Sequence, residues 1–245
     1  MKNIESYEKL IKDRQACTKC HQKDNLGQDN LRQFEKLLSE NVYPSLLSPW
    51  CPVGENSLNA EILIVGQDFG IFQYLEEEKN MDGLKLKEEG NSTNEKLRDY
   101  LQKAGLLNAN IYFTNSILCI KNGETKITKK GTSMSTPIKL KWCINCSETF
   151  LKPLITDHLI NVKIIITLGK HALFSINHIA DSLNNEIKPL IDLIAIKQCI
   201  HISNKPYTLI PMLHPSFDHL SVKGQKEAKK AKELWEDIKD KIYVN

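Results

Sequence analysis

Three polar residues with complementary chemistry follow short apolar segments of the chain. Asp68 comes two residues after an apolar run that ends at Gly66, Asn115 ends the run 111–115, and His214 follows the run 207–213. Alone, each is equally typical of a turn, a helix cap or a structural hydrogen bond. If the three meet, a carboxylate, an amide and an imidazole can act on one ligand, because they offer negative charge, donors and acceptors together.

The segments that must position these residues alternate between strand and helix patterns. Continuous apolar runs at 60–66, 111–115, 162–169 and 207–213 predict strands buried on both faces. Helical spacing predicts helices at 4–14, 96–105 and 146–159, and a further helix from His171. We expect an α/β fold, a three-layer α/β/α sandwich with a central, mostly parallel four-stranded sheet. In such sheets ligands bind beyond the carboxyl ends of the strands, where all three polar residues fall.

Composition limits the remaining possibilities. The chain has 245 residues with 41% hydrophobic and 26% charged residues, which suits a single domain spanning 1–245. It has no apolar run of roughly 18 residues and no secretory signal pattern, so we expect a cytoplasmic protein that does not enter a membrane. The G-x-x-x-G at 66–70 lacks the dinucleotide-binding pattern, which argues against a nucleotide cofactor.

Positive charge is concentrated in the chain although the net charge is only +3. The segment 123–137 is polar and basic and is expected to be a loop. It lies within a lysine-rich stretch opposed only by Glu124, and a second lysine group occupies 223–232. Such groups are typical of solvated faces and also of phosphate contacts. The lysines of the first stretch are Lys121, Lys126, Lys129, Lys130, Lys139 and Lys141.

The seven cysteines indicate metal or cluster binding, with buried inert thiols as the alternative. A disulfide framework is not expected in a cytosolic chain. Cys17 and Cys20 form one C-x2-C pair, and Cys143 and Cys146 form another. Two such pairs can also make a zinc site, but zinc ribbons are local in sequence and would leave Cys119 unexplained.

The ordered motifs resemble those of the uracil-DNA glycosylase superfamily. The segment VGQDFG is similar to the family's first active-site motif, LHPS to its second, and YFTNSILC to the strand that carries the pocket asparagine. The cysteine pattern is similar to that of the iron–sulfur classes, known as families 4 and 5. The resemblance implies a DNA glycosylase with a 4Fe–4S cluster on Cys17, Cys20, Cys119 and Cys146, carried by an N-terminal segment of about residues 1–55.

The resemblance also implies a role for each motif residue. Asp68 and His214 would be catalytic, one stabilising the sugar cation and orienting water, the other stabilising the leaving base. The iron–sulfur classes usually have Glu-Ala where this chain has Gln67-Asp68, so its first motif is a hybrid. The substrate pocket would be formed by Gly66, Gln67, Phe69, Gly70, Asn115 and Ser216, and the DNA contacts by Leu220, Lys129 and Lys130.

Several alternatives stay open at the level of sequence. Leu220 is equally typical of a core residue, Phe69 and Phe72 are both candidates to stack on the base, and Cys143 competes with Cys146 as fourth ligand. Uracil is the default substrate by resemblance, while a bulky modified cytosine of phage DNA is the alternative, because Gly70 replaces a guarding tyrosine. A zinc-bearing nucleic-acid binding module without catalysis is a third hypothesis. A monomer that binds DNA is expected.

Overall fold

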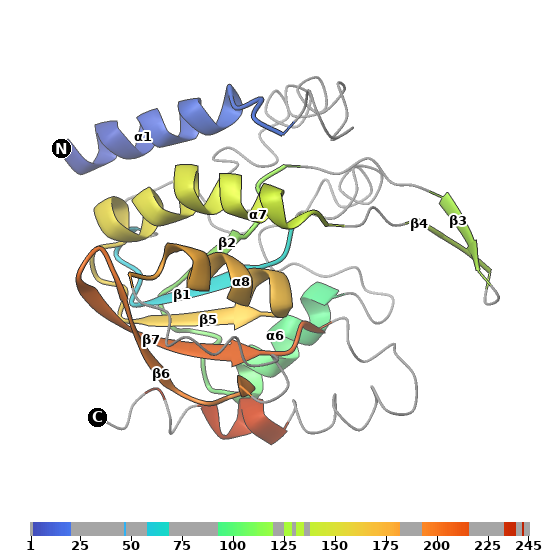
Figure 1. Ribbon diagram of the computed structural model, residues 1–245. Helices are drawn as coiled ribbons and strands as arrows, with labels where there is room; N and C mark the ends of the chain where they lie inside the picture. The colour runs from blue at the N-terminus through green and yellow to red at the C-terminus, as the bar shows by residue number, and fades with distance from the viewer. Residues whose placement is uncertain are drawn as a thin grey trace.

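The computed structural model describes residues 2–20, 47, 58–68, 93–119, 125–128, 131–134, 138–181, 193–215, 233–238 and 242. Its main feature is a five-stranded sheet in the order β2-β1-β5-β7-β6 (Figure 1). The first four of these strands are parallel to one another, and they are β1 (Ile62–Gly66), β2 (Ile111–Asn115), β5 (Ile164–Leu168) and β7 (Lys205–Met212). The expected mostly parallel α/β fold is therefore confirmed.

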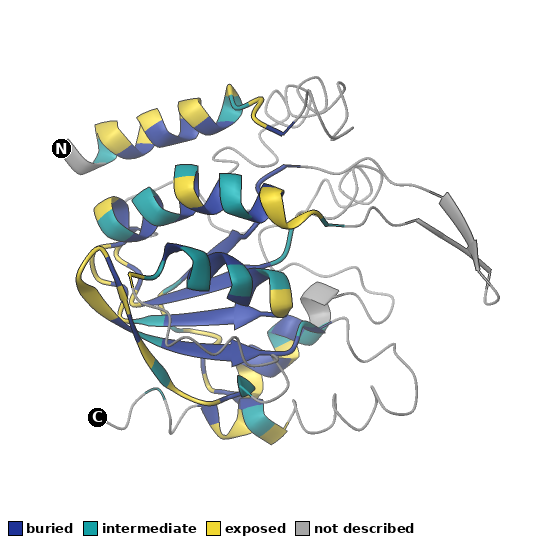
Figure 2. Ribbon diagram, in the orientation of Figure 1, coloured by how far each residue is buried: buried dark blue, intermediate teal, exposed yellow. Residues whose placement is uncertain are grey.

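Helices cover both faces of the sheet. Alternate residues of each strand point to opposite sides, so each strand contributes side chains to two separate cores. Leu63 and Val65 of β1 face a core shared with helices α1 (Lys2–Gln15) and α8 (Lys170–Ile179). Ile62 and Ile64 face a second core, formed with helix α6 (Thr93–Lys103) and with residues 233–238. Figure 2 shows the central strands buried between these layers.

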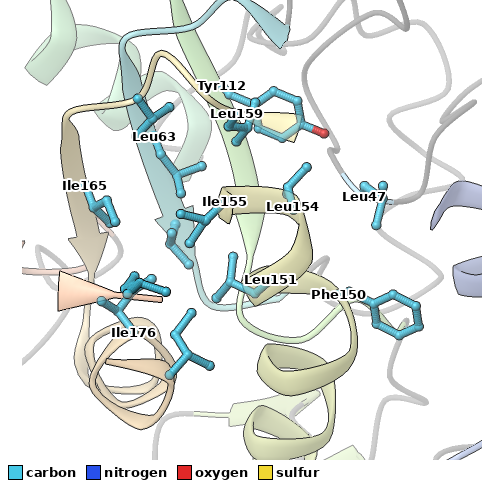
Figure 3. Close-up of a cluster of buried hydrophobic side chains, with 14 of the residues drawn as sticks. Leu47, Leu63, Tyr112, Phe150, Leu151, Leu154, Ile155, Leu159, Ile165 and Ile176 are labelled. Carbon is cyan, nitrogen blue, oxygen red and sulfur yellow. The ribbon is translucent and has the colours of Figure 1, made fainter. Parts of the chain in front are cut away.

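The first core is the larger one and joins distant parts of the chain (Figure 3). Fully buried Leu63, Tyr112, Leu151 and Ile176 belong to it. Burying one such large apolar side chain contributes roughly 1.5–3 kcal/mol. The Tyr7 and Tyr112 hydroxyls are 2.7 Å apart and hydrogen-bonded, so helix α1 is attached directly to β2.

The fifth strand was not predicted. Strand β6 (Gln198–Ile202) pairs antiparallel with β7 at one edge of the sheet. Ser203 and Asn204 connect the two with φ angles of 50° and 62°, as a two-residue hairpin turn requires. Asp181 accepts hydrogen bonds from both of their backbone N–H groups, at 2.9 and 2.6 Å.

One further expectation is wrong, and a second is right about a helix but not about where it begins. The segment 123–137 contains a hairpin of β3 (Thr125–Thr128) and β4 (Gly131–Met134), which extends away from the main sheet (Figure 1). The helix expected from Cys146 begins earlier, as α7 (Leu140–Cys146), and continues through the π-helical stretches η1 (Ser147–Leu151) and η2 (Leu154–His158). Pro153 lies between the two stretches, and a wider π turn accommodates a residue that lacks an N–H.

The other helix predictions agree with the structure. The helix expected at 4–14 is α1, and the one expected from His171 is α8. Helix α6 ends just before Gly105, which has a φ of 67° and so fits the left-handed conformation that follows many helices. No helix in the described part of the chain is long and apolar enough to cross a membrane.

Candidate active site

The carboxyl ends of three parallel strands, β1, β2 and β7, bring the predicted site residues to one edge of the sheet. Gln67 and Asp68 follow β1, Asn115 ends β2, and His214 lies two residues past the end of β7. Only β5 separates the strands of Asp68 and His214, so these two strands are roughly 10 Å apart. Asp68 and His214 are each partly exposed, as residues that reach a ligand must be.

Two glycines let the side chains of Asn115 and His214 approach the backbone. Gly66 pairs with Asn115 in the parallel register, and a Cβ at position 66 would collide with Asn115 Oδ1. Gly169, which follows β5, has a φ of 88°, and a Cβ there would lie 3.2 Å from the Cβ of His214. Glycine is thus required at both positions for close packing, and at 169 for its conformation as well.

Hydrogen bonds fix the turn that carries Gln67 and Asp68. The Gln67 carbonyl oxygen accepts from Ser116 Oγ at 2.8 Å and from the Ile117 N–H at 3.0 Å. The Gln67 side chain donates from Nε2 to Asp68 Oδ2 at 3.0 Å, and its Oε1 is 2.8 Å from His171 Nδ1. His171 was not among the predicted site residues, although it lies two residues after Gly169 at the same edge of the sheet.

The buried thiol of Cys143 on α7 lies near the residues that follow β1 and β2. Burial raises the pKa of Cys143, the nearby Asp68 charge raises it further, and the hydroxyls of Ser175 and Ser116 oppose the rise. The Ser175 hydroxyl lies beside this thiol, yet it has no hydrogen bond of good geometry in the structure. Cys143 therefore neighbours the candidate active site.

Cys146 contacts Cys119, which also packs in one buried cluster with Cys20 and Cys143. A hydrogen bond with Cys119, followed by burial, raises the pKa of Cys146 well above its usual range. Cys119 in turn lies 3.6 Å from a terminal nitrogen of Arg14, which also donates to the Leu118 carbonyl oxygen. Arg14 is only 1% exposed, so a buried positive charge lies beside this pair of sulfur atoms.

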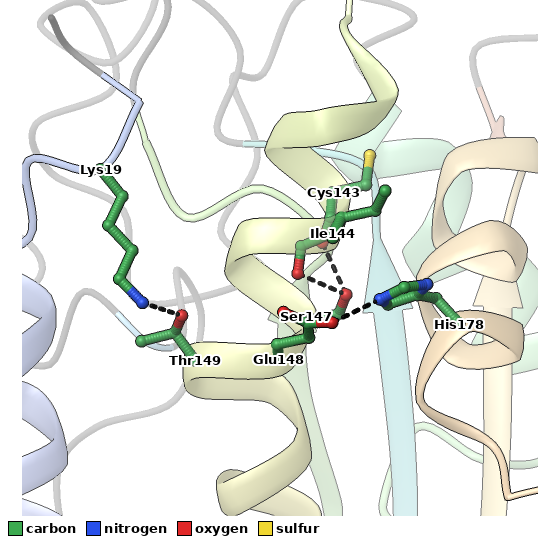
Figure 4. Close-up of polar contacts among 7 residues, drawn as sticks. All are labelled: Lys19, Cys143, Ile144, Ser147, Glu148, Thr149 and His178. Carbon is green, nitrogen blue, oxygen red and sulfur yellow. Dashed lines mark hydrogen bonds and ion pairs between the residues drawn. The ribbon is translucent and has the colours of Figure 1, made fainter.

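The N-terminal cysteine pair approaches the same helix. Asn145 of α7 donates to Cys20 Sγ at 3.3 Å. Figure 4 shows the neighbouring contact, in which Lys19 donates to Thr149 at 2.9 Å. Cys17 packs against the core cluster that includes Cys146. As arranged, no three His, Cys, Asp or Glu side chains in the described ranges form a group that could hold a metal ion. The nature of the donors still fits a soft metal or cluster, since the buried thiols of Cys20 and Cys119, from two other segments, lie near those of α7.

Several predicted residues lie outside the described part of the chain. They are Phe69, Gly70, Phe72, Lys129, Lys130, Ser216 and Leu220. Their roles remain predictions. The described part of the predicted substrate pocket is formed by Gly66, Gln67 and Asn115, and all three lie together at the ends of β1 and β2.

An open parallel sheet with a carboxylate, an amide and an imidazole at its carboxyl edge is the architecture of an α/β enzyme that acts on a ligand bound at this edge. The model of one protein family, the Uracil DNA glycosylase superfamily, matches residues 53–239 of the 245. The chain belongs to this superfamily, whose members are DNA glycosylases, hydrolases that act in base excision. A comparison with curated proteins found no match.

Proposed function

We propose that this protein removes uracil from DNA by hydrolysing its N-glycosidic bond, with Asp68 and His214 as the catalytic residues. The observation that carries the proposal is that these two residues follow strands separated only by β5, with Asn115 at the same edge. An extruded base between them would meet a carboxylate on one side and an imidazole on the other. Extruding the base costs on the order of a few kcal/mol, which the pocket must repay.

The reaction follows from the chemistry of these side chains. As the bond between C1′ and the base nitrogen breaks, its electron pair leaves with the base and the sugar becomes an oxocarbenium ion. The Asp68 carboxylate stabilises this cation and orients a water molecule, whose oxygen forms the new bond to C1′. His214 donates a hydrogen bond to the base oxygen on which negative charge develops. The proton released by the water balances the charge of the departing base, and an abasic site remains.

Asn115 selects the base in this proposal. Its carboxamide lies against Gly66 and is only 2% exposed, so its environment restricts its orientation. A fixed amide offers one donor and one acceptor to the edge of a pyrimidine, as uracil recognition requires. A panel of duplexes containing uracil, hypoxanthine, hydroxymethylcytosine or glucosylated hydroxymethylcytosine, scored for abasic sites, tests the substrate. Release of uracil supports the proposal, whereas release of only a modified cytosine would replace it.

Substitution of the catalytic pair tests the mechanism. We expect Asp68→Asn and His214→Ala each to slow excision by roughly 100- to 1000-fold, as the loss of one preorganised electrostatic group does in other enzymes. The exposed Asp99 on α6 provides a matched control, and Asp99→Asn should excise at the wild-type rate. Unchanged excision in both Asp68→Asn and His214→Ala would refute the assigned roles.

We further propose that Cys17, Cys20, Cys119 and Cys146 hold a 4Fe–4S cluster. Its ligands would attach the N-terminal segment to the rest of the domain. The contact between Cys119 and Cys146 supports this ligand set. Cys143 packs in the same buried cluster as Cys20 and Cys119, so it is the alternative fourth ligand that substitution must distinguish. The buried guanidinium of Arg14 fits as well, because it would neutralise thiolate ligands. The cluster would supply structural stability, since hydrolysis needs no electron transfer.

Elemental analysis of protein purified without oxygen tests the cluster. We expect iron and acid-labile sulfide in equal amounts, lost in Cys119→Ser and Cys146→Ser. Cys143→Ser should retain them, and so should Cys199→Ser, whose thiol is exposed on β6. Stoichiometric zinc without iron would establish the zinc alternative instead.

A further inference from the structure

One contact at the sheet edge has no role in the mechanism above. His171 in the first turn of α8 reaches the Gln67 side chain, 104 positions earlier in the chain. The two meet because β1 and β5 are parallel neighbours, with Val65 opposite Thr167, so that the segments following them run side by side. The contact therefore links the β5–α8 turn to the motif that carries Asp68.

The direction of these hydrogen bonds is set by chemistry. Gln67 Oε1 is a carbonyl oxygen and can only accept, so His171 must donate from Nδ1–H. The Gln67 amide nitrogen then donates to Asp68 Oδ2, which accepts as a carboxylate. Rotating the amide by half a turn would place its oxygen against the carboxylate and its NH2 against the Nδ1–H, so both contacts would become repulsive.

Without His171, the hydrogen bond to the neighbouring Asp68 would be the remaining described contact of the Gln67 amide. The backbone at Gln67 is held from the other side by Ser116 and Ile117, which bind its carbonyl oxygen. The side chain is only partly buried and has three rotatable bonds, so burial alone does not select one amide orientation. Two described contacts hold the amide, the His171 donor at Oε1 and the Asp68 carboxylate at Nε2, and the His171 contact comes from a separate element of the fold.

We propose that His171 is a positioning residue for excision: it orients the Gln67 amide, which in turn holds the Asp68 carboxylate. The proposal rests on the proposed function of Asp68. His171 acts through Gln67 and does not itself touch the substrate. We expect His171 to contribute strongly to the excision rate, because a displacement of about 1 Å in a reacting group can lower a rate by on the order of 100-fold.

Single-turnover excision kinetics test the proposal. His171→Leu removes the donor and should lower the excision rate by roughly 10- to 100-fold while leaving DNA affinity unchanged. His171→Asn keeps a donor near the position of Nδ1 and should recover most of the rate. His178 provides a matched control on the same helix: its ring pairs with Glu148 at 2.9 Å, away from Gln67, so His178→Leu should excise normally (Figure 4). A normal rate in His171→Leu would overturn the proposal.

A double substitution tests whether His171 acts through Gln67. In a Gln67→Ala background, His171→Leu should cause no further loss, because the connecting amide is already gone. An additional loss equal to that in the wild-type background would show that His171 acts directly, against the proposal.

Nitrogen-15 NMR of the imidazole rings tests the hydrogen bond without any excision assay. The His171 signals, assigned by their disappearance in His171→Leu, should report the Nδ1–H tautomer and should shift in Gln67→Ala. An Nε2–H tautomer, or signals that do not respond to Gln67→Ala, would overturn the proposal even in an active enzyme. Absence of excision by the wild-type protein on every DNA would instead refute the proposed function.

Discussion

The carboxyl edge of the sheet and the cysteine-bearing end of α7 are held in different ways. At the edge, parallel strands in fixed register present Asp68, Asn115 and His214, and backbone pairing sets their spacing. Around α7, Cys20 and Cys119 are attached by side-chain contacts from Asn145 and Arg14. A site built on a sheet is specified by the fold itself, whereas a site built from several segments depends on each individual contact.

The largest expected effect tests the α7 region through Arg14. Arg14→Ala leaves a buried gap and an unpaired Leu118 carbonyl, so we expect the free energy of unfolding to fall by about 3 kcal/mol. Urea unfolding measures the change. Lys12→Ala, at an exposed position of the same helix, should change stability little. Equal losses in the two variants would mean that the buried guanidinium contributes nothing specific.

The next effect concerns activity at the edge. Gly66→Ala places a methyl group where the Asn115 side chain lies, so the amide must rotate away from its position. We expect excision to slow by about 100-fold. In an Asn115→Ala background the same substitution should cost little more, because the two changes remove one interaction. Additive losses in the excision assay would contradict the assigned role of Asn115.

A smaller expected effect separates the stability cost of backbone strain from the effect of Gly169 on the excision rate. Gly169→Ala forces a side chain to φ 88° and ψ 175°, a conformation that essentially only glycine adopts, which costs roughly 1–3 kcal/mol of stability. Gly105→Ala carries a penalty of roughly 1–2 kcal/mol after the end of α6, because Gly105 also has a positive φ. Thermal unfolding should show a loss in both, but only Gly169→Ala should slow excision, since only there would the new methyl group meet His214. Equal excision rates would show that this contact is dispensable.

The smallest effect lies at the hairpin between β6 and β7. Backbone N–H groups, chiefly that of Asn204, lower the pKa of Asp181. A carboxylate with a lowered folded-state pKa stabilises the fold above its unfolded-state pKa, and this stabilisation is lost as pH falls through the folded-state value. We expect Asp181→Asn to melt slightly below wild type at neutral pH and equally in acid. A difference that grows in acid would have the wrong sign.

The same contrast between backbone pairing and side-chain contacts explains what the sequence could predict. The four parallel strands are continuous apolar runs, and the edge rule for such sheets then locates Asp68, Asn115 and His214 together. Strand β6 was not predicted because its Q-C-I-H-I pattern is short and half polar. The β3–β4 hairpin was not predicted because polar residues such as threonine, lysine and serine make up most of its two strands, a composition typical of loops.

Contacts between side chains far apart in sequence leave no pattern to detect. The hydrogen bond from His171 to Gln67 depends on two side chains that meet only after the sheet has formed. The start of α7 at Leu140 was missed because its lysine, tryptophan and cysteines do not give a clear apolar period. The neighbours of the two α7 cysteines also needed coordinates, since a C-x2-C spacing treats both alike. Cys146 contacts Cys119, and Cys143 packs in one buried cluster with Cys20 and Cys119.

The strand order has a consequence for when activity first arises. Strand β7 is the last strand in the described part of the chain, yet it lies between β5 and β6 and is followed closely by His214. A ribosome-bound or prematurely terminated product that stops before residue 205 would have Asp68 and Asn115 but would lack His214. If His214 has the proposed role, such an incomplete translation product would be unable to excise a base even with β1, β2 and β5 in place.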